Sequence, residues 1–309
     1  MIELTHYSVL LKEAVDALNI QPDGIYIDGT FGRGGHSAEI LKMLGPNGRL
    51  ICFDKDDQAV AAAEARFGSD PRFTIVKASF ASMGERLEEM GLAGKVSGIL
   101  LDLGVSSPQI DDAERGFSFR LDGPLDMRMA STGVSAAQWL AEVERQELST
   151  VLKEYGEERF AWRIAGAIVA AREEAPIETT TQLANIIRAA SRTRETRIDA
   201  ATRSFQGIRI YINRELDDLT ECLEQVLTLL AVGGRLAVIS FHSLEDRIVK
   251  HFVRAQSSSN VFPRGLPIRE DEMPKPPMRA IGKAIKASKD EIAENVRSRS
   301  AVMRVAEKQ

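Results

Sequence analysis

The sequence is short of cysteine, of long apolar runs and of positive charge, and each shortage excludes a class of protein. Its two cysteines, Cys52 and Cys222, lie far apart in apolar surroundings, which argues for a reducing compartment and against a disulfide framework. No apolar stretch approaches the roughly 18 residues that a membrane-spanning helix requires. Residues 1–6 show no basic segment ahead of an apolar core, so we expect no secretory signal and a cytoplasmic protein. Lys and Arg number 40 against 45 Asp and Glu, and a net charge of −5 for the whole chain argues against a nucleic-acid partner.

The composition is that of a soluble globular protein. The chain has 309 residues, of which 44% are hydrophobic and 28% charged, so a disordered or fibrous chain is excluded. At about 150 residues per domain, this length predicts two domains.

Short apolar runs alternate with amphipathic segments in the first third of the chain. The runs that predict strands are residues 25–27, 50–53, 73–76 and 98–101. The segments between them that predict helices are residues 37–44, 58–67 and 83–90. Because continuous apolar strands are buried on both faces, this alternation predicts a doubly wound, parallel α/β sheet.

The alternation stops after Leu103 and resumes near residue 214. Between these points we expect a loop at 104–124, then a helical block from 135 to 190 with helices at 157–174 and from about Thr179. Beyond it we expect a helix at 214–230 closed by Gly233-Gly234, a strand at 236–239, a helix at 243–256 with a Ser243/Asp246 capping box, a loop at 257–279 and a strand at 302–305. The prediction is a discontinuous domain of residues 1–109 and 207–309 with a helical insertion at 110–206. The insertion leaves the sheet at the carboxyl edge, where such folds bind ligands.

The segment Asp28-Gly29-Thr30-Phe31-Gly32-Arg33-Gly34-Gly35 follows a predicted strand and opens a predicted helix. Glycine permits positive φ and a close approach of the backbone to a ligand. No glycine after Gly34 completes the Gly-x-Gly-x-x-Gly spacing of dinucleotide binders. An acidic strand end followed by these glycines is instead typical of S-adenosylmethionine (SAM) sites. Asp54 ends the second strand, where a carboxylate can accept both ribose hydroxyls. Together these features predict a SAM site, with a tight turn and a helix cap as the simpler alternatives.

The glycine loop resembles that of amino-directed methyltransferases. Longer strings resemble one family more narrowly, the bacterial 16S ribosomal RNA (cytosine-N4) methyltransferases called RsmH or MraW. These strings are residues 27–37, 99–109, 111–119, 123–129 and 239–250, and the resemblance covers almost the whole chain. The octapeptide Ser240-Phe241-His242-Ser243-Leu244-Glu245-Asp246-Arg247 is highly specific to that family. The chain departs from the family at Asp199-Ala200, where many members carry His-Pro, and this bears on how the insertion contacts RNA.

The resemblance implies a Rossmann-like class I SAM-dependent methyltransferase with an RNA-recognition insertion. It implies methylation of N4 of a cytidine in the decoding centre, on an assembled or nearly assembled small ribosomal subunit. The residues expected to bind the cofactor are Asp28, Gly32, Gly34, Gly35, His36, Asp54, Phe80, Asp102 and Gln109. Phe80 would flank the adenine, and plain core packing is its alternative.

Candidate catalytic residues follow the fourth and fifth predicted strands. The Asp/Asn/Ser-Pro-Pro-Tyr/Phe loop of amino methyltransferases is absent, and only Ser107-Pro108 is similar to it. A cytosine amino nitrogen is a weak nucleophile, so acceptors have to bind its hydrogens and direct its lone pair at the methyl group. Asp102 and the backbone carbonyls of residues 105–108 are candidates, and a cofactor contact or a local structural role for Asp102 stays open. His242 is expected either to touch the target base or a phosphate, or to fix the turn.

Cysteine usage separates two reaction types. Carbon-5 methylation of a pyrimidine requires a cysteine thiolate nucleophile. Neither Cys52 nor Cys222 belongs to a candidate loop, so we expect direct transfer to nitrogen without a covalent intermediate. No set of His, Cys and carboxylate residues has the spacing of metal ligands, so no metal is expected.

Positive charge is concentrated in two segments. Residues 188–214 carry a net charge of +5, all of it from arginine, and residues 262–309 carry +4. Guanidinium groups match phosphate geometry, so both segments are expected to grip RNA, although a solvated helix face is the simpler alternative. The expected RNA contacts are Arg188, Arg192, Arg194, Arg197 and Arg203. These local charges outweigh the acidic total as a guide to the partner.

The expected partner is the small ribosomal subunit with its 16S RNA, with no role for DNA or a membrane. Two competing hypotheses are a DNA amino-methyltransferase and a non-catalytic, SAM-binding ribosome assembly factor. The sequence leaves a homodimer open.

Overall fold

The computed structural model describes residues 8–193, 198–258 and 275–309. The chain divides into two compact units, one made of the residues up to Gly104 and from Leu216 onward, the other of Val105–Glu215. The boundaries expected at 109/110 and 206/207 both fall inside the second unit, because a helix starts at Ser107 and another runs unbroken to Asn213.

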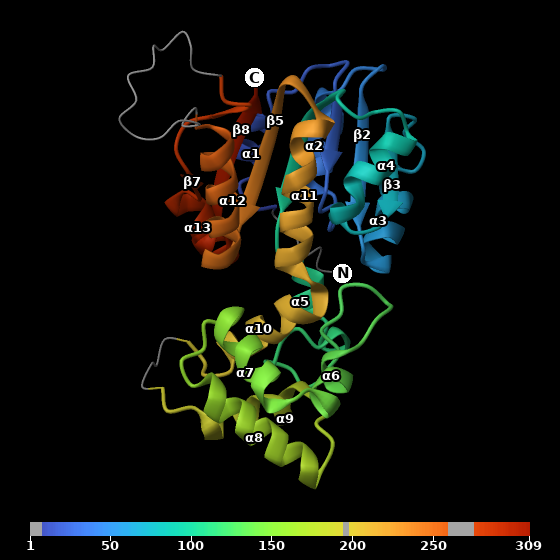
Figure 1. Ribbon diagram of the computed structural model, residues 1–309. Helices are drawn as coiled ribbons and strands as arrows, with labels where there is room; N and C mark the ends of the chain where they lie inside the picture. The colour runs from blue at the N-terminus through green and yellow to red at the C-terminus, as the bar shows by residue number, and fades with distance from the viewer. Residues whose placement is uncertain (1–7, 194–197, 259–274) are drawn as a thin grey trace, which may run out of the picture. The chain divides into compact units, whose positions relative to one another are not determined.

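The first unit is built on one eight-stranded sheet (Figure 1). Its strands are β1 (Ile25–Asp28), β2 (Arg49–Asp54), β3 (Phe73–Lys77), β4 (Val96–Asp102), β5 (Leu230–Ser240), β6 (Met278–Ala280), β7 (Ile285–Lys286) and β8 (Val302–Lys308). The order is β3-β2-β1-β4-β5-β8-β6, with β7 also paired to β8. The five strands from β3 to β5 are parallel, whereas β8 runs antiparallel to β5. The predicted doubly wound α/β sheet is confirmed, and its parallel strands bring the residues at their carboxyl ends to one edge.

Helices cover both faces of this sheet, because alternate residues of each strand enter two separate cores. In β1, Tyr26 enters the core that is shared with α1 (Leu11–Leu18), α2 (Gly35–Met43) and α3 (Asp57–Phe67). Ile27, the next residue, enters the core that is shared with α4 (Met83–Glu89), α11 (Glu215–Leu229) and α12 (Ser243–Gln256). The remaining elements in the described part of the unit are η1 (Phe80–Ser82), α13 (Lys289–Glu294) and η4 (Val296–Ser300).

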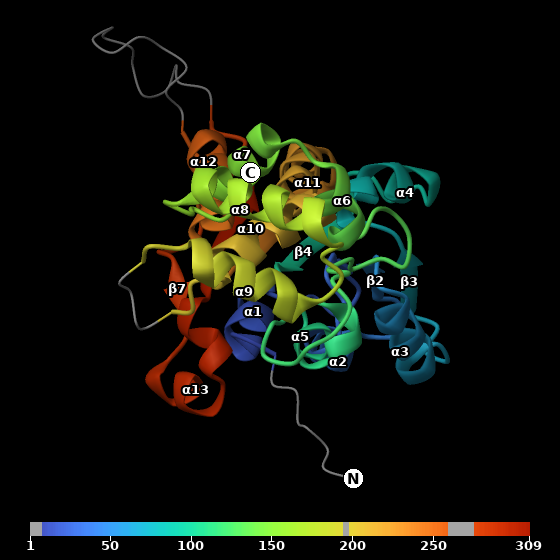
Figure 2. The same cartoon turned by 90° about the horizontal axis from the view of Figure 1, so that it is seen from below.

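The second unit is helical (Figure 2). Its elements are α5 (Ser107–Asp111), η2 (Ala113–Arg115), α6 (Ala136–Glu142), α7 (Arg145–Glu154), α8 (Ala161–Glu174), α9 (Thr180–Ala190) and α10 (Thr202–Asn213). One apolar core, which includes Leu140, Leu148, Ile164, Ile187 and Ile208, holds α6 to α10 together.

Several local predictions differ from the structure. The expected loop at 104–124 contains α5 and η2, because a capping box at Ser106 starts a helix within it. The first part of the helical block expected at 135–190 contains two helices, since α6 ends before Val143 and α7 begins at Arg145. The helix expected from residue 157 begins at Ala161, because Glu157 adopts a left-handed φ of 51°.

Toward the C-terminus, Gly233 and Gly234 lie inside β5 instead of ending the helix before it. The capping box of α12 joins His242 to Glu245, one residue before the Ser243/Asp246 pair that the spacing suggested. The expected loop at 257–279 falls mostly outside the described residues. No described helix is long and apolar enough to cross a membrane.

Candidate active site

Asp28, the last residue of β1, braces the glycine loop from inside. Its side chain is 1% exposed, and its Oδ1 accepts the backbone N–H of Thr30 at 3.1 Å. Its Oδ2 accepts the hydroxyl of Ser37 at 2.6 Å. Burial raises the pKa of Asp28 above its usual range. We expected Asp28 to bind the cofactor. In the structure its carboxylate holds the glycine loop in place.

The loop itself needs glycine at two positions. Gly32 has a φ of 55° and Gly34 a φ of 72°, both in the left-handed region that side chains disfavour. A Cβ on Gly34 would also lie 2.6 Å from the ring of Phe31. The loop leads directly into Gly35 and His36, the first residues of α2, where the backbone N–H groups have no intrahelical acceptor. Such a helix start can receive an anionic group of a ligand.

Asp54 ends β2 and ties that strand to the glycine loop. Its Oδ2 accepts the N–H of Gly32 at 2.8 Å, and its Oδ1 accepts the N–H of Asp56 at 2.9 Å. Burial, with smaller contributions from neighbouring carboxylates, raises the pKa of Asp54 to about 6. Each carboxylate oxygen accepts about two hydrogen bonds, so both retain capacity for a ligand's hydroxyl groups.

Asp102 ends β4 with an incomplete set of partners. Its backbone N–H donates to Thr30 Oγ1 at 2.6 Å, which ties β4 to the glycine loop. Its Oδ1 is buried and has no hydrogen-bond partner among the described residues. Burial, followed by the nearby charges of Asp28 and Glu245, raises the pKa of Asp102 well above its ordinary value. The Asp102 side chain is 24% exposed, and a carboxylate with one buried, unpartnered oxygen fits a ligand that brings donors or positive charge.

His36 does not supply that charge. Its Nε2 lies 3.1 Å from the carbonyl of Val9, to which it donates, and its Nδ1 lies 3.7 Å from Asp102 Oδ2. Burial lowers the pKa of His36 to about 4, so the ring is neutral near pH 7. In the described part of the chain, no Lys or Arg forms an ion pair with Asp28, Asp54 or Asp102.

Phe80 and His242 occupy turns at the same edge of the sheet. Phe80 begins η1 just after β3 and packs, half-buried, against the apolar core, so its core-packing role is present. His242 follows β5 and precedes α12, where Glu245 Oε2 accepts the N–H groups of Phe241 at 2.8 Å and His242 at 3.3 Å. Nε2 of His242 lies 3.1 Å from Glu245 Oε1. Glu245, which the sequence analysis did not select, therefore holds this turn.

Neither cysteine is a candidate nucleophile. Both side chains are free, buried and fully inaccessible. Burial raises the pKa of the Cys52 thiol well above its ordinary value, and raises that of Cys222 to about 12. Both thiols stay protonated near neutral pH, and a protonated thiol is a poor nucleophile.

Three predicted site residues belong to the second unit and form the first turn of α5. Ser107 and Pro108 start the helix, and Gln109 Oε1 accepts the N–H of Ser106 at 2.8 Å as part of its capping box. The carbonyls of Ser106 and Pro108 accept N–H groups from the turns that follow. We expected both carbonyls to bind the substrate. In the structure, both already accept intramolecular hydrogen bonds.

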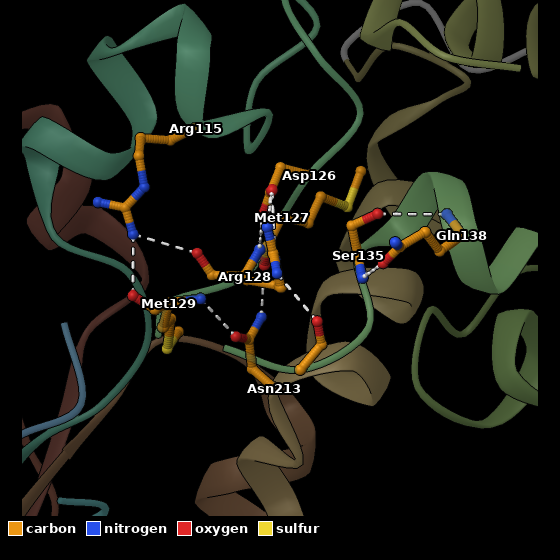
Figure 3. Close-up of polar contacts among 9 residues, drawn as sticks. Arg115, Asp126, Met127, Arg128, Met129, Ser135, Gln138 and Asn213 are labelled. Carbon is orange, nitrogen blue, oxygen red and sulfur yellow. Dashed lines mark hydrogen bonds and ion pairs between the residues drawn. The ribbon is translucent and has the colours of Figure 1, made fainter. Parts of the chain in front are cut away.

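Elsewhere in the second unit, polar side chains hold the segment that follows η2 (Figure 3). Asn213, 6% exposed, accepts the N–H of Met129 at 2.7 Å and donates to the carbonyl of Met127 at 2.7 Å. Arg115 donates to the carbonyls of Arg128 and Met129 at 3.1 and 2.9 Å, and the Arg128 guanidinium pairs with Asp126. Met127 is held at a φ of 60°, a strained conformation for a bulky residue that surrounding contacts have to enforce.

The predicted RNA-binding arginines differ in their surroundings. Arg188 forms two-pronged contacts with Asp199 at 2.9 to 3.2 Å and lies over the ring of Phe119. Arg192 is exposed, and Arg203 is half-buried. Arg194 and Arg197 lie outside the described residues.

Comparisons with known proteins find relatives along almost the whole chain. The MraW methylase family model matches residues 3–309. Ribosomal RNA small subunit methyltransferase H of Alteromonas mediterranea is 58% identical over 308 residues, which are 99% of this chain and 98% of that relative. The protein of the same name from Neisseria meningitidis serogroup A is 57% identical over 304 residues, which are 98% of this chain and 92% of the relative. Among solved structures, an rRNA methylase from Streptococcus thermophilus aligns with 100% of this chain and 98% of its own, with a TM-score of 0.44 and 12% identity. Since the family match spans nearly every residue, the chain belongs to the MraW methylase family.

Proposed function

We propose that this methylase uses SAM to methylate N4 of a cytidine in the decoding centre of small-subunit (16S) ribosomal RNA. The observation that carries the proposal is the carboxylate of Asp102, whose buried Oδ1 has no hydrogen-bond partner and which forms no ion pair with a Lys or Arg among the described residues. A cationic ligand bound at this edge would offset that electrostatic cost. The names of the relatives support a ribosomal RNA substrate, and the family resemblance of the sequence supports the cytidine N4 position.

Different residues of the chain would bind different parts of the cofactor. The start of α2, at Gly35 and His36, offers backbone N–H groups to a carboxylate. The N–H of Gly34 already donates to the carbonyl of Phe31 at 2.8 Å, so Gly34 is proposed to shape the turn. Asp54 retains acceptor capacity for ribose hydroxyls, and Phe80 offers an aromatic face to adenine. When bound, SAM supplies an electrophilic methyl group on a positively charged sulfur. Gln109 is assigned to the cofactor by family resemblance alone.

Transfer to nitrogen is favoured over transfer to carbon because both thiols are buried and protonated. The amino group of cytosine needs acceptors for its hydrogens so that its lone pair becomes available. Asp102, once ionised, has an unused oxygen for this purpose. His242 is proposed to contact the target base or a phosphate, with Glu245 fixing its position. Arg188, Arg192 and Arg203 of the second unit are proposed to contact RNA phosphates, since guanidinium groups bind phosphate well.

One experiment tests the proposal directly. The protein is incubated with methyl-labelled SAM and, in separate reactions, with purified small subunits, naked 16S RNA and DNA. We expect label in RNA from the subunits, recovered as N4-methylcytidine after nuclease digestion. Label in DNA alone, or in no substrate, would contradict the proposed function, and label at carbon 5 would contradict the assignment to nitrogen.

A further inference from the structure

Helix α11 carries a buried carboxylate that joins two segments of the candidate cofactor site. Asp218 is 4% exposed, and its Oδ2 accepts the ammonium of Lys55 at 2.7 Å and the hydroxyl of Ser79 at 2.6 Å. Lys55 directly follows Asp54, and Ser79 directly precedes Phe80. One oxygen of α11 therefore contacts both segments. It binds Lys55, next to the proposed ribose acceptor, and Ser79, next to the proposed adenine contact.

Gln225, seven residues later on the same face of α11, holds the Phe80 turn at two further points. Its Oε1 accepts the N–H of Gly84 at 2.6 Å, and its Nε2 donates to the carbonyl of Ala81 at 2.7 Å. A Cβ on Gly84 would collide with the Gln225 amide, so glycine is needed for this approach. Both views place α11 beside α4, the helix that continues from this turn (Figures 1 and 2).

The two segments that Asp218 joins are adjacent in the sheet. Asp54 of β2 pairs with Lys77 of β3, and the N–H of Ala78 donates to the carbonyl of Asp54 at 3.0 Å. Beyond this point the strands end, and no ladder hydrogen bonds fix the distance between the following residues. The contacts of Lys55 and Ser79 with Asp218 provide the next constraint on that distance.

We propose that Asp218 is a positioning residue that sets the spacing between Asp54 and Phe80, and with it the fit of the adenosine half of the cofactor. Gln225 acts with it by fixing the turn that carries Phe80. The inference rests on the proposed SAM-dependent function and adds to it two residues from a helix that contributes none of the expected cofactor contacts.

The test measures cofactor affinity in folded protein by calorimetry at 25 °C. The ligands are SAM, S-adenosylhomocysteine and 5′-methylthioadenosine, which share the adenosine group. We expect Asp218→Asn and Asp218→Ala to weaken all three by a similar factor of about 5 to 20, as the loss of one or two hydrogen bonds predicts. The KM for SAM should rise, while kcat at saturating SAM stays within about twofold. Glu224→Gln, an equal change of charge on an exposed position of the same helix, should change neither quantity.

A double-mutant cycle separates positioning from general destabilisation. Ser79→Ala and Asp218→Ala should be clearly non-additive in SAM affinity, because each removes the same contact. Unchanged affinity in folded Asp218 variants, or a loss of kcat without a rise in KM, would overturn the role of Asp218. Absence of SAM binding by the wild-type protein would instead contradict the proposed function.

Discussion

Nδ1 of His36 lies 3.7 Å from Oδ2 of Asp102, and this close approach is not an ion pair. The ring donates from Nε2 to the carbonyl of Val9, and burial holds the pKa of His36 near 4. A neutral imidazole thus presents a lone pair toward a carboxylate whose own pKa is strongly raised. The edge of the sheet is arranged for a positive charge that the described residues do not provide.

The first prediction concerns acid stability. Because the pKa of His36 falls from 6.5 to about 4 on folding, its contribution to stability is complete above pH 6.5 and is lost as the pH falls through 4. This shift corresponds to about 3 kcal/mol. Replacing His36 with Gln, which does not titrate, should remove that part of the acid dependence, measured by urea unfolding between pH 4 and 8.

The buried carboxylates act in the opposite direction, since their raised pKa values favour the fold at low pH and lose that contribution as the pH rises. The comparison of wild type with the His36 variant cancels them. Parallel pH profiles for the two proteins would show that His36 is not the group that titrates.

The second prediction is that Asp102→Asn changes stability and activity in opposite senses. Removing a charge with one buried, unpaired oxygen should raise the stability of the ligand-free protein at pH 8 by about 1 to 2 kcal/mol. As the pH falls through the raised pKa of Asp102, the wild-type carboxyl takes up a proton, so this gain should largely disappear. Methyl transfer should fall by roughly a hundredfold or more. A variant that is less stable than wild type at pH 8 would argue that Asp102 is stabilised by contacts in the free protein.

The third prediction concerns Asp54, whose pKa lies near 6 in the free protein. SAM affinity should decline as the pH falls below 6, because protonation removes the acceptor for the ribose hydroxyls. Asp54→Ala should lose most of the affinity, since hydrogen bonds to a charged group contribute roughly 1.5 to 3 kcal/mol each. Asp54→Asn should bind weakly and without this pH dependence, and the exposed Asp23→Asn should behave as wild type. Calorimetry between pH 5 and 8 measures each case, and wild-type affinity in Asp54→Ala would remove Asp54 from the cofactor site.

The sheet and its glycine loop were predictable because their signals are local. Continuous apolar runs located β1 to β4 to within two residues at each end, and glycine spacing located the turn into α2. The surroundings of Asp102 were not predictable, because Asp28 and Thr30 approach it from the end of β1 and Glu245 from α12, far away in sequence. The contacts of α11 were missed for the same reason, since periodicity marks Asp218 as a helical position and says nothing of Lys55. The split between α10 and α11 at Arg214, with a φ of 53°, carries no glycine or proline that would have predicted it.

The fourth prediction concerns the clamp that the Asn213 side chain forms on Met127 and Met129 (Figure 3). Asn213→Ala removes hydrogen bonds to Met127 and Met129 and leaves a buried N–H and a buried carbonyl without these partners. Each such group costs about 1 to 3 kcal/mol, so the free energy of unfolding should fall by roughly 2 to 4 kcal/mol. The same substitution at Asn185, exposed on α9, should cost less than about 0.5 kcal/mol. Equal effects of the two substitutions in urea unfolding would show that the clamp does not hold the strained Met127.

The last prediction distinguishes the arginines of the second unit. Asp199 neutralises Arg188 in the free protein, and an exposed pair of this kind is worth about 0 to 1 kcal/mol, so a phosphate can displace the carboxylate only at that cost. Asp199→Asn should therefore strengthen binding to small subunits by a few fold and steepen its salt dependence, because Arg188 would then meet the RNA without a competing anion. Arg192→Ala should weaken binding more than Arg188→Ala, since Arg192 has no ion pair among the described residues to offset its charge. Binding measured across a salt series tests both statements. Equal losses from the two arginines, together with an unchanged affinity in Asp199→Asn, would mean that Asp199 does not compete with RNA for Arg188.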